Sequence, residues 1–168
     1  VGEINRDMPF TYGDTFVSIK EFDLLVNSTE TSFPHEPIQA GQQMKMVAEN
    51  VASIIKDGDC LGFSIGSLFE ALVPHLKGKK DLGIHSLYFT DAMAELVKSG
   101  AVTNSRKTPF RGKSLTSYAM GSKKLMKWLH RNPRVEFQGT DFVCNPTFIG
   151  KIPQFVALYQ AEKVDLSG

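Results

Sequence analysis

The sequence predicts an α/β protein built on an open, largely parallel sheet with flanking helices. The first observation is that short apolar segments alternate with segments of helical periodicity, each roughly 10 to 15 residues long. The second is that the apolar segments ending near residues 65, 86 and 120 run into loops rich in small or polar residues. This alternation is typical of strands joined by crossover helices, which place the strands parallel to one another.

The composition is that of one ordinary globular domain. The 168 residues carry a formal net charge of +1, with 42% hydrophobic and 22% charged residues, a balance that does not favour a nucleic-acid partner. No apolar run approaches the roughly 18 residues that cross a bilayer, and the first residues do not resemble a signal peptide. Cys60 and Cys144 are too few for a disulfide framework. We therefore expect a soluble protein of the cytoplasm, with neither nucleic acid nor membrane as a partner.

The first 35 residues are predicted to be an entry segment or linker with short strands, followed by an α/β domain over residues 36–168. Within the entry segment, residues 15–19 branch and alternate like a strand, and residues 21–30 are expected to be extended or briefly helical. The cluster of Ser, Thr and Pro over residues 27–37 is the best linker candidate in the chain.

Residues 38–56 carry the clearest helical pattern, because apolar side chains recur at steps of three and four residues. The side chains expected to face inward are Met44, Val47, Val51, Ile54 and Ile55. Gly58 is predicted to end this helix. Residues 60–65 then predict a short buried strand, which passes through Gly66 and Ser67 into a second helix. Its inward residues are Leu68, Leu72, Val73 and Leu76.

Residues 82–89 predict the next strand, and Asp91 is the expected N-cap of a helix that ends at Gly100. Residues 113–120 predict a further strand, after which Ser122 caps another helix. Three more segments are predicted as strands, namely residues 135–138, 155–160 and 163–166.

Ligands of open α/β sheets bind beyond the carboxyl ends of the strands, which directs attention to the loops rich in small residues. In the loop Ser64–Ser67, Gly66 lets backbone N–H groups approach a phosphate, carboxylate or oxyanion, although a plain turn has the same sequence. The sequence lacks a dinucleotide fingerprint, a phosphate loop, a Gly-x-Ser-x-Gly elbow and the spacing of a metal site. A nicotinamide or ATP cofactor, a usual serine hydrolase and a metal centre are therefore not expected.

The remaining chemistry-bearing residues have structural interpretations beside the functional ones. His85 ends a predicted strand, where it is either an imidazole at the edge of the core or a functional base. Glu70, Asp91 and Glu95 are expected on helix surfaces or at helix ends. Residues 106–113 hold four cations and form either a solvated loop or a surface for the phosphates of an anionic cofactor.

Taken together, six segments resemble the acetyl-CoA hydrolase and transferase family that includes 4-hydroxybutyrate CoA-transferase. They are MPFTYGDTFV, IIKDGDCLGFSIG, KDLGIHS, SGAVTNSRK, GKSLTSYAMGS and RNPRVEFQGTDFVCNP. They follow in order over almost the whole chain. The resemblance implies a CoA-transferase-like fold and a chain that is the later part of a longer, two-half protein. The chain begins with Val1 rather than methionine, which agrees with this expectation.

The resemblance also implies a chemistry on acyl-CoA thioesters. An active-site glutamate of the family attacks the thioester to give an acyl-glutamyl anhydride and then a glutamyl-CoA thioester, while N–H groups of glycine loops stabilise the oxyanion. That glutamate follows a Gly-Ile-His-Ser run, which is here followed by Leu87, and a Gly-Ile-Gly loop of the family is here Ser64, Ile65, Gly66. The implied CoA and acyl contacts are Ser64, Ile65, Gly66, Ser67, Gly83, His85, Ser86 and Leu87.

A leucine cannot form an acyl anhydride, so three possibilities stay open. Another carboxylate, Asp91 or Glu70, replaces the glutamate; or His85 activates water for direct hydrolysis beside the retained oxyanion loop; or the chain binds acyl-CoA or serves as a scaffold without reacting. We expect an acyl-CoA transferase or acetyl-CoA hydrolase domain, with a non-catalytic acyl-CoA-binding or scaffolding domain as the alternative. The expected partners are a CoA thioester with a small carboxylate or water, and either an N-terminal CoA-transferase half or a second copy. No covalently bound cofactor is expected.

Overall fold

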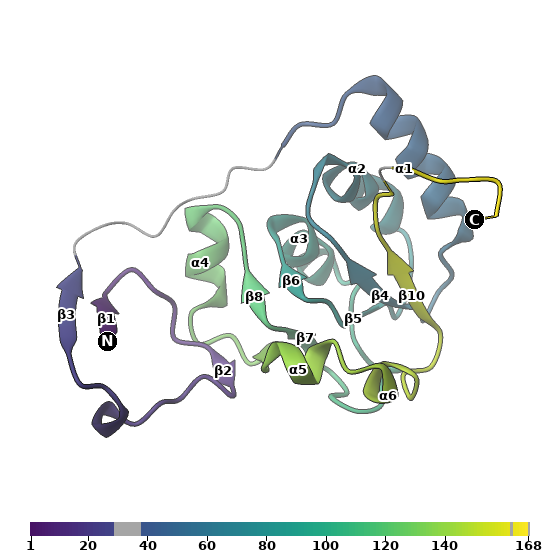
Figure 1. The fold of residues 1–168 in the computed structure, drawn as a ribbon. Helices are drawn as coiled ribbons and strands as arrows, with labels where there is room; N and C mark the ends of the chain where they lie inside the picture. Colours follow the sequence, from purple (N-terminus) through teal and green to yellow (C-terminus); the bar gives the residue numbers. More distant parts are fainter. Residues whose placement is uncertain (29–37, 162, 168) are drawn as a thin grey trace.

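The computed structural model describes residues 1–28, 38–161 and 163–167 (Figure 1). The chain begins with β1 (Gly2–Asn5), β2 (Tyr12–Gly13), a 3-10 helix η1 (Ile19–Glu21) and β3 (Leu25–Ser28). The central part holds α1 (Gln42–Ile54), β4 (Cys60–Phe63), α2 (Ser67–Leu76), β5 (Gly83–Ile84), β6 (Tyr88–Phe89) and α3 (Asp91–Ser99). It ends with β7 (Ser114–Thr116), β8 (Tyr118–Ala119), α4 (Lys123–Leu129), β9 (Val135–Phe137), α5 (Thr140–Val143), α6 (Pro146–Ile149) and β10 (Phe155–Leu158).

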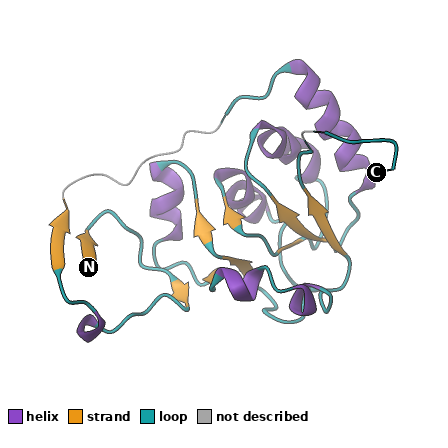
Figure 2. Ribbon diagram, viewed as in Figure 1, coloured by secondary structure: helices purple, strands orange, loops and turns teal. Residues whose placement is uncertain are grey.

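The predicted α/β class with parallel strands is confirmed. All strand pairs in the described ranges are parallel: β10–β4–β5, β7–β9–β2, β6–β8 and β1–β3. A parallel bridge between His85 and Leu115 joins the β5 and β7 segments. In Figure 2 the helices α1 to α4 lie along one side of these strands, while α5 and α6 lie on the other side in that view. The parallel strands therefore form several small sheets flanked by helices, and the pair β1–β3 lies apart from the others (Figure 1).

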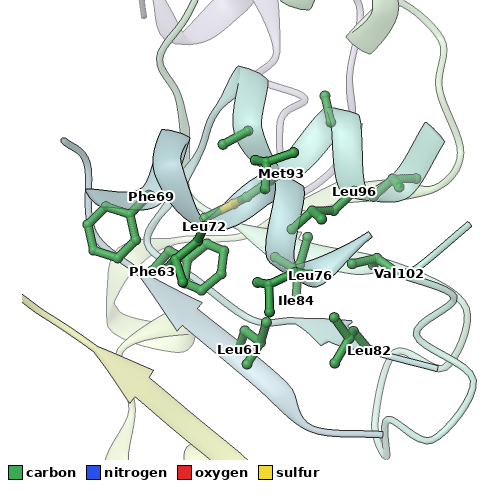
Figure 3. Close-up of a cluster of buried hydrophobic side chains, with 14 of the residues drawn as sticks. Leu61, Phe63, Phe69, Leu72, Leu76, Leu82, Ile84, Met93, Leu96 and Val102 are labelled. Carbon is green, nitrogen blue, oxygen red and sulfur yellow. The ribbon is translucent and has the colours of Figure 1, made fainter. Parts of the chain in front are cut away.

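The core lies between the strands β4 and β5 and the helices α2 and α3 (Figure 3). Leu61 and Ile84 from the strands meet Leu72 and Leu76 of α2 and Leu96 of α3, and all five are fully buried. Burying one such aliphatic side chain contributes about 1.5 to 3 kcal/mol. This packing fixes the ends of β4 and the start of α2, where the predicted ligand loop lies.

The helix α1 was predicted correctly in type, and its expected inward face is right in part, because Ile55 is buried and Met44 and Val51 pack against the core. Ala48 and Ala52 are its buried residues, whereas Val47 and Ile54 are 44% and 63% exposed. Alanine has no side chain beyond Cβ, so this stripe lets α1 pack closely against α2. The apolar periodicity alone does not distinguish this face from the adjacent one.

Several predicted strands differ from the structure. Residues 15–19 form no strand, and residues 163–166 form none either; in the first case Ser18 caps η1 instead, accepting a hydrogen bond from the Lys20 N–H. The long predicted strands 82–89 and 113–120 are each broken in two, as β5 with β6 and β7 with β8. The short helices α5 and α6 were not predicted. Most of the linker candidate, residues 29–37, lies outside the described residues.

Candidate functional site

Three loops meet at the carboxyl ends of the parallel strands β4, β6 and β8. They border a small, partly open cavity lined by Ile38, Ile65, Gly66, Glu70, Thr90, Asp91, Met120 and Gly121. Two of the three loops expected at this edge, those after residues 65 and 120, are therefore brought together. The third contribution comes from Thr90 at the end of β6, and not from Ser86 at the end of the β5 segment.

Gly66 is the N-cap of α2 and has a φ of +138°, which a residue with a side chain rarely adopts. The first N–H groups of a helix have no intrahelical acceptor, so those of Ser67 and Leu68 are suited to an oxyanion or carboxylate beside Gly66. The interpretation of the loop Ser64–Ser67 as an anion-binding turn agrees with this geometry.

Asp91 has a structural role that the sequence did not suggest. Its carboxylate accepts hydrogen bonds from the N–H and the hydroxyl of Ser122, both at 2.7 Å, and so joins α3 to the start of α4. Gly121 makes this approach possible, because a Cβ there would lie 2.3 Å from the Asp91 carboxylate. The prediction that Asp91 is an N-cap is wrong, since Thr90 occupies that position; Ser122 is an N-cap as predicted.

Thr90 is one of the residues of this cavity that the sequence did not indicate, together with Ile38, Met120 and Gly121. It is the N-cap of α3, yet its side chain makes no capping hydrogen bond. The residue is only 8% exposed, and its hydroxyl has no hydrogen-bond partner among the residues that the structure describes. A threonine after an apolar strand carries no sequence signal that its hydroxyl is directed elsewhere than to the helix.

Glu70 lies one turn into α2 and is half-buried against the same cavity. Burial raises the pKa of its carboxyl above the ordinary value of 4.5, and the nearby carboxylates of Asp91 and Glu95 act in the same direction. Glu70 also lines an open groove of about 570 Å³ between α1 and α2. Glu70 therefore borders both the small cavity and a groove large enough for a small-molecule ligand.

His85 is directed away from this cavity. Its ring is 2% exposed, its Nε2 lies 2.7 Å from the Val143 carbonyl oxygen, and the ring stacks on Phe148. Burial lowers the pKa of His85 and the Lys107 ammonium adds to this, while the Val143 carbonyl opposes it, so the neutral ring donates its Nε2 proton to Val143. The burial of His85 agrees with an imidazole at the edge of the core, although its Nδ1 has no hydrogen-bond partner among the residues that the structure describes.

The neighbours of His85 also serve the frame. The Ser86 hydroxyl donates to the Phe63 carbonyl at 2.6 Å and accepts from the Phe63 N–H at 3.1 Å, which ties β5 to β4. Gly83 leaves room for Lys107, whose Cγ would lie 3.0 Å from a Cβ at this position. Leu87 is half-buried, and its carbonyl oxygen accepts hydrogen bonds from the N–H groups of residues 117 and 118.

Three of the four cations of residues 106–113 are engaged within the protein, and the fourth, Arg111, is exposed. Lys107 is 2% exposed and donates to the carbonyl oxygens of Ile84 and Lys113. Burial lowers its pKa from 10.5 to about 8. Arg106 pairs with an aspartate and Lys113 with a glutamate of the same chain. No signal in the sequence distinguishes Lys107 from its exposed neighbours.

The described part of the chain shows no grouping of three or more His, Cys, Asp or Glu side chains that could hold a metal ion. Within the same residues, no helix has the length and apolar character needed to cross a membrane.

Comparisons with known proteins converge on one family. Residues 121–168 match the acetyl-CoA hydrolase/transferase C-terminal domain. The whole chain is 38% identical to 39% of the 4-hydroxybutyrate coenzyme A transferase of Clostridium kluyveri, and 33% identical to 38% of the succinyl-CoA:cyclohexane-1-carboxylate CoA transferase of Geobacter metallireducens. The crystal structure of 4-hydroxybutyrate CoA-transferase from Porphyromonas gingivalis superposes with a TM-score of 0.86 at 34% identity, over 92% of this chain and 40% of that one. The chain thus spans about two fifths of the length of the curated relatives it matches.

Proposed function

Because the chain belongs to the acetyl-CoA hydrolase/transferase family, we propose that it supplies the thioester-binding part of an acyl-CoA transferase or acetyl-CoA hydrolase. The observation that carries the proposal is the convergence of the loops after β4, β6 and β8 at the start of α2, where Gly66 exposes helix N–H groups. Donors in this position stabilise the oxyanion that forms when a nucleophile attacks a thioester carbonyl. The proposed substrates are an acyl-CoA with a small carboxylate or water.

The proposed contacts to CoA and the acyl group come from the loop after β4 and from the break between β5 and β6. They are Ser64, Ile65, Gly66 and Ser67 in the loop, and Leu87 at the break. Gly83, His85 and Ser86 support these contacts indirectly: Gly83 leaves room for Lys107, His85 Nε2 donates to the Val143 carbonyl, and the Ser86 hydroxyl donates to the Phe63 carbonyl.

A second candidate function is favoured by one residue. Leu87 occupies the position that the family resemblance assigns to the nucleophilic glutamate, and an aliphatic side chain cannot form an anhydride. The candidate is therefore an acyl-CoA-binding or scaffolding domain without covalent chemistry. It shares the same binding loops, so the two functions differ in turnover and not in ligand.

The test compares the full-length protein with its Leu87→Glu variant in CoA release and CoA transfer from acetyl-CoA, with borohydride trapping of a glutamyl-CoA thioester. A Leu87→Gln variant is the matched control, since it has the same size but no nucleophilic carboxylate. Turnover by the unmodified protein supports the enzyme. An inert protein whose Leu87→Glu variant alone gives a trappable thioester supports the binding domain, and absence of CoA-thioester binding refutes both.

The cellular setting belongs to the proposal as well. We place the protein in the cytoplasm, which the free thiols of Cys60 and Cys144 support. Packing against an N-terminal CoA-transferase half or a second copy is supported by the share of the relatives that this chain spans.

A further inference from the structure

We propose that Glu70 is a general base that activates a water molecule for thioester hydrolysis in the cavity beside Gly66. The inference rests on the proposed function and narrows it, because it assigns the reaction as hydrolysis and names the group that replaces a glutamate at position 87. It follows from three observations. The cavity has room for a water molecule, and the Thr90 hydroxyl has no hydrogen-bond partner among the described residues. The Asp91 carboxylate and His85 Nε2 are hydrogen-bonded to other groups.

The cavity has room for a water molecule. Its volume is about 20 Å³, and a single water molecule needs roughly 10 to 15 Å³. Two residues with polar side chains, Glu70 and Thr90, are among those that line it, which suits a water molecule.

The Thr90 hydroxyl supplies independent evidence for an occupant. Threonine at an N-cap ordinarily accepts a hydrogen bond from the first turn of its helix, but here that bond is absent and the hydroxyl is buried without a partner among the described residues. Buried polar groups are almost always hydrogen-bonded, to the protein or to ordered water. A water molecule between Thr90 and Glu70 satisfies the hydroxyl and is held for attack.

Glu70 is the carboxylate that remains available in this cavity. Both oxygens of Asp91 are engaged by Ser122, and the His85 ring lies against Val143 on another side of the sheet. Burial of Glu70 brings its pKa closer to neutral pH, which strengthens it as a base. The charged and titratable groups around it are Asp91 and Glu95 of α3 and, along the open groove, Lys45 and Glu49 of α1 and His75 of α2.

The reaction balances with water as the only co-reactant. The water oxygen attacks the thioester carbonyl carbon while Glu70 takes one of its protons, and the resulting oxyanion is stabilised by the N–H groups at the start of α2. Collapse of this intermediate breaks the carbon–sulfur bond, and Glu70 returns the proton to the leaving thiolate. The products are free CoA and the carboxylic acid, which loses its remaining proton to solvent.

The experiment measures acetyl-CoA hydrolysis and acetyl-CoA binding by the full-length protein and its Glu70→Gln variant. The matched control is Glu21→Gln, which makes the same chemical change at an exposed residue of η1, away from the cavity. We expect Glu70→Gln to lower kcat by about 100-fold or more with little change in the Kd for acetyl-CoA, while Glu21→Gln keeps kcat. A Thr90→Val variant should lower kcat by about 10-fold, because the water loses one of its hydrogen bonds.

The pH profile separates a base from a merely structural residue. Hydrolysis by the unmodified protein should fall as the pH drops through the raised pKa of Glu70, and this limb should be absent in Glu70→Gln. Wild-type kcat in Glu70→Gln overturns the inference and leaves the proposed function intact, as does acetyl-CoA binding without hydrolysis. A protein that neither binds nor cleaves acetyl-CoA overturns the proposed function itself.

Discussion

Replacing Ser86 by alanine should destabilise the strand β4 without weakening the binding of a CoA thioester. The family resemblance suggests Ser86 as a contact to the ligand, but its hydroxyl is buried and makes two hydrogen bonds to the backbone of Phe63. Its atoms are therefore used to join β5 to β4, one residue before the loop that begins at Ser64.

The size of the effect follows from these two bonds. Each hydrogen bond contributes about 1 kcal/mol net, and alanine also leaves buried backbone groups of Phe63 without this partner, which adds roughly 1 kcal/mol or more. A loss of about 3 kcal/mol in the local free energy of opening corresponds to an increase of roughly 100-fold in the amide exchange rate. The change should be concentrated in residues 60–63.

The assay is hydrogen–deuterium exchange read by mass spectrometry on the full-length protein, together with titration of acetyl-CoA. Ser53→Ala is the control, because the Ser53 hydroxyl makes one local bond on the exposed side of α1. The reasoning is refuted if Ser86→Ala exchanges at the unmodified rate across β4 while its affinity for acetyl-CoA falls.

Two further predictions concern buried groups near the site. Gly121→Ala should lower stability by about 2 to 4 kcal/mol, measured by thermal or denaturant unfolding, because its Cβ would lie 2.3 Å from the Asp91 carboxylate and displace it from Ser122; an unchanged midpoint would contradict this. The second change, Lys107→Met, should remove a rise of stability with pH. Burial lowers the Lys107 pKa to about 8 against 10.5 in the unfolded chain, so stability from this group is complete above pH 10.5 and is lost as the pH falls through 8. The free energy of unfolding is compared between about pH 8 and pH 9, because the Cys60 thiol, whose pKa is raised to about 11, lowers stability as the pH rises above 9.0. Equal slopes of this free energy against pH in the unmodified protein and Lys107→Met would count against the assignment.

The sequence predicts the frame of this protein better than its site. Strand and helix alternate as expected, because apolar runs and periodicity record burial, and the helix termini at Gly100 and Ser122 are where their sequences place them. The interruption at Leu87 could not be predicted, since residues 82–89 are mostly apolar and the break depends on pairing with the equally broken residues 114–119.

The roles of individual polar residues could not be predicted for a related reason. Asp91 looks like a helix cap in sequence but caps the turn of a different helix, 31 residues away. Lys107 looks like one cation among four, yet its ammonium is held by two carbonyl groups inside the protein. Both depend on which segments the sheet brings together, and that information is absent from the local pattern.

The run from Gly83 to Leu87 shows how a loop can keep its form while its chemistry changes. Gly83 makes room for Lys107, His85 binds the Val143 carbonyl, and Ser86 ties two strands together, so each of these residues is required by the fold. Leu87 contributes its backbone carbonyl to the same network, and that contribution does not depend on its side chain. Position 87 can therefore exchange a nucleophile for an aliphatic group at little cost to the frame. It follows that resemblance over this run supports the fold and the binding loops, whereas the reaction has to be assigned from the residues that line the cavity, as in the proposal for Glu70.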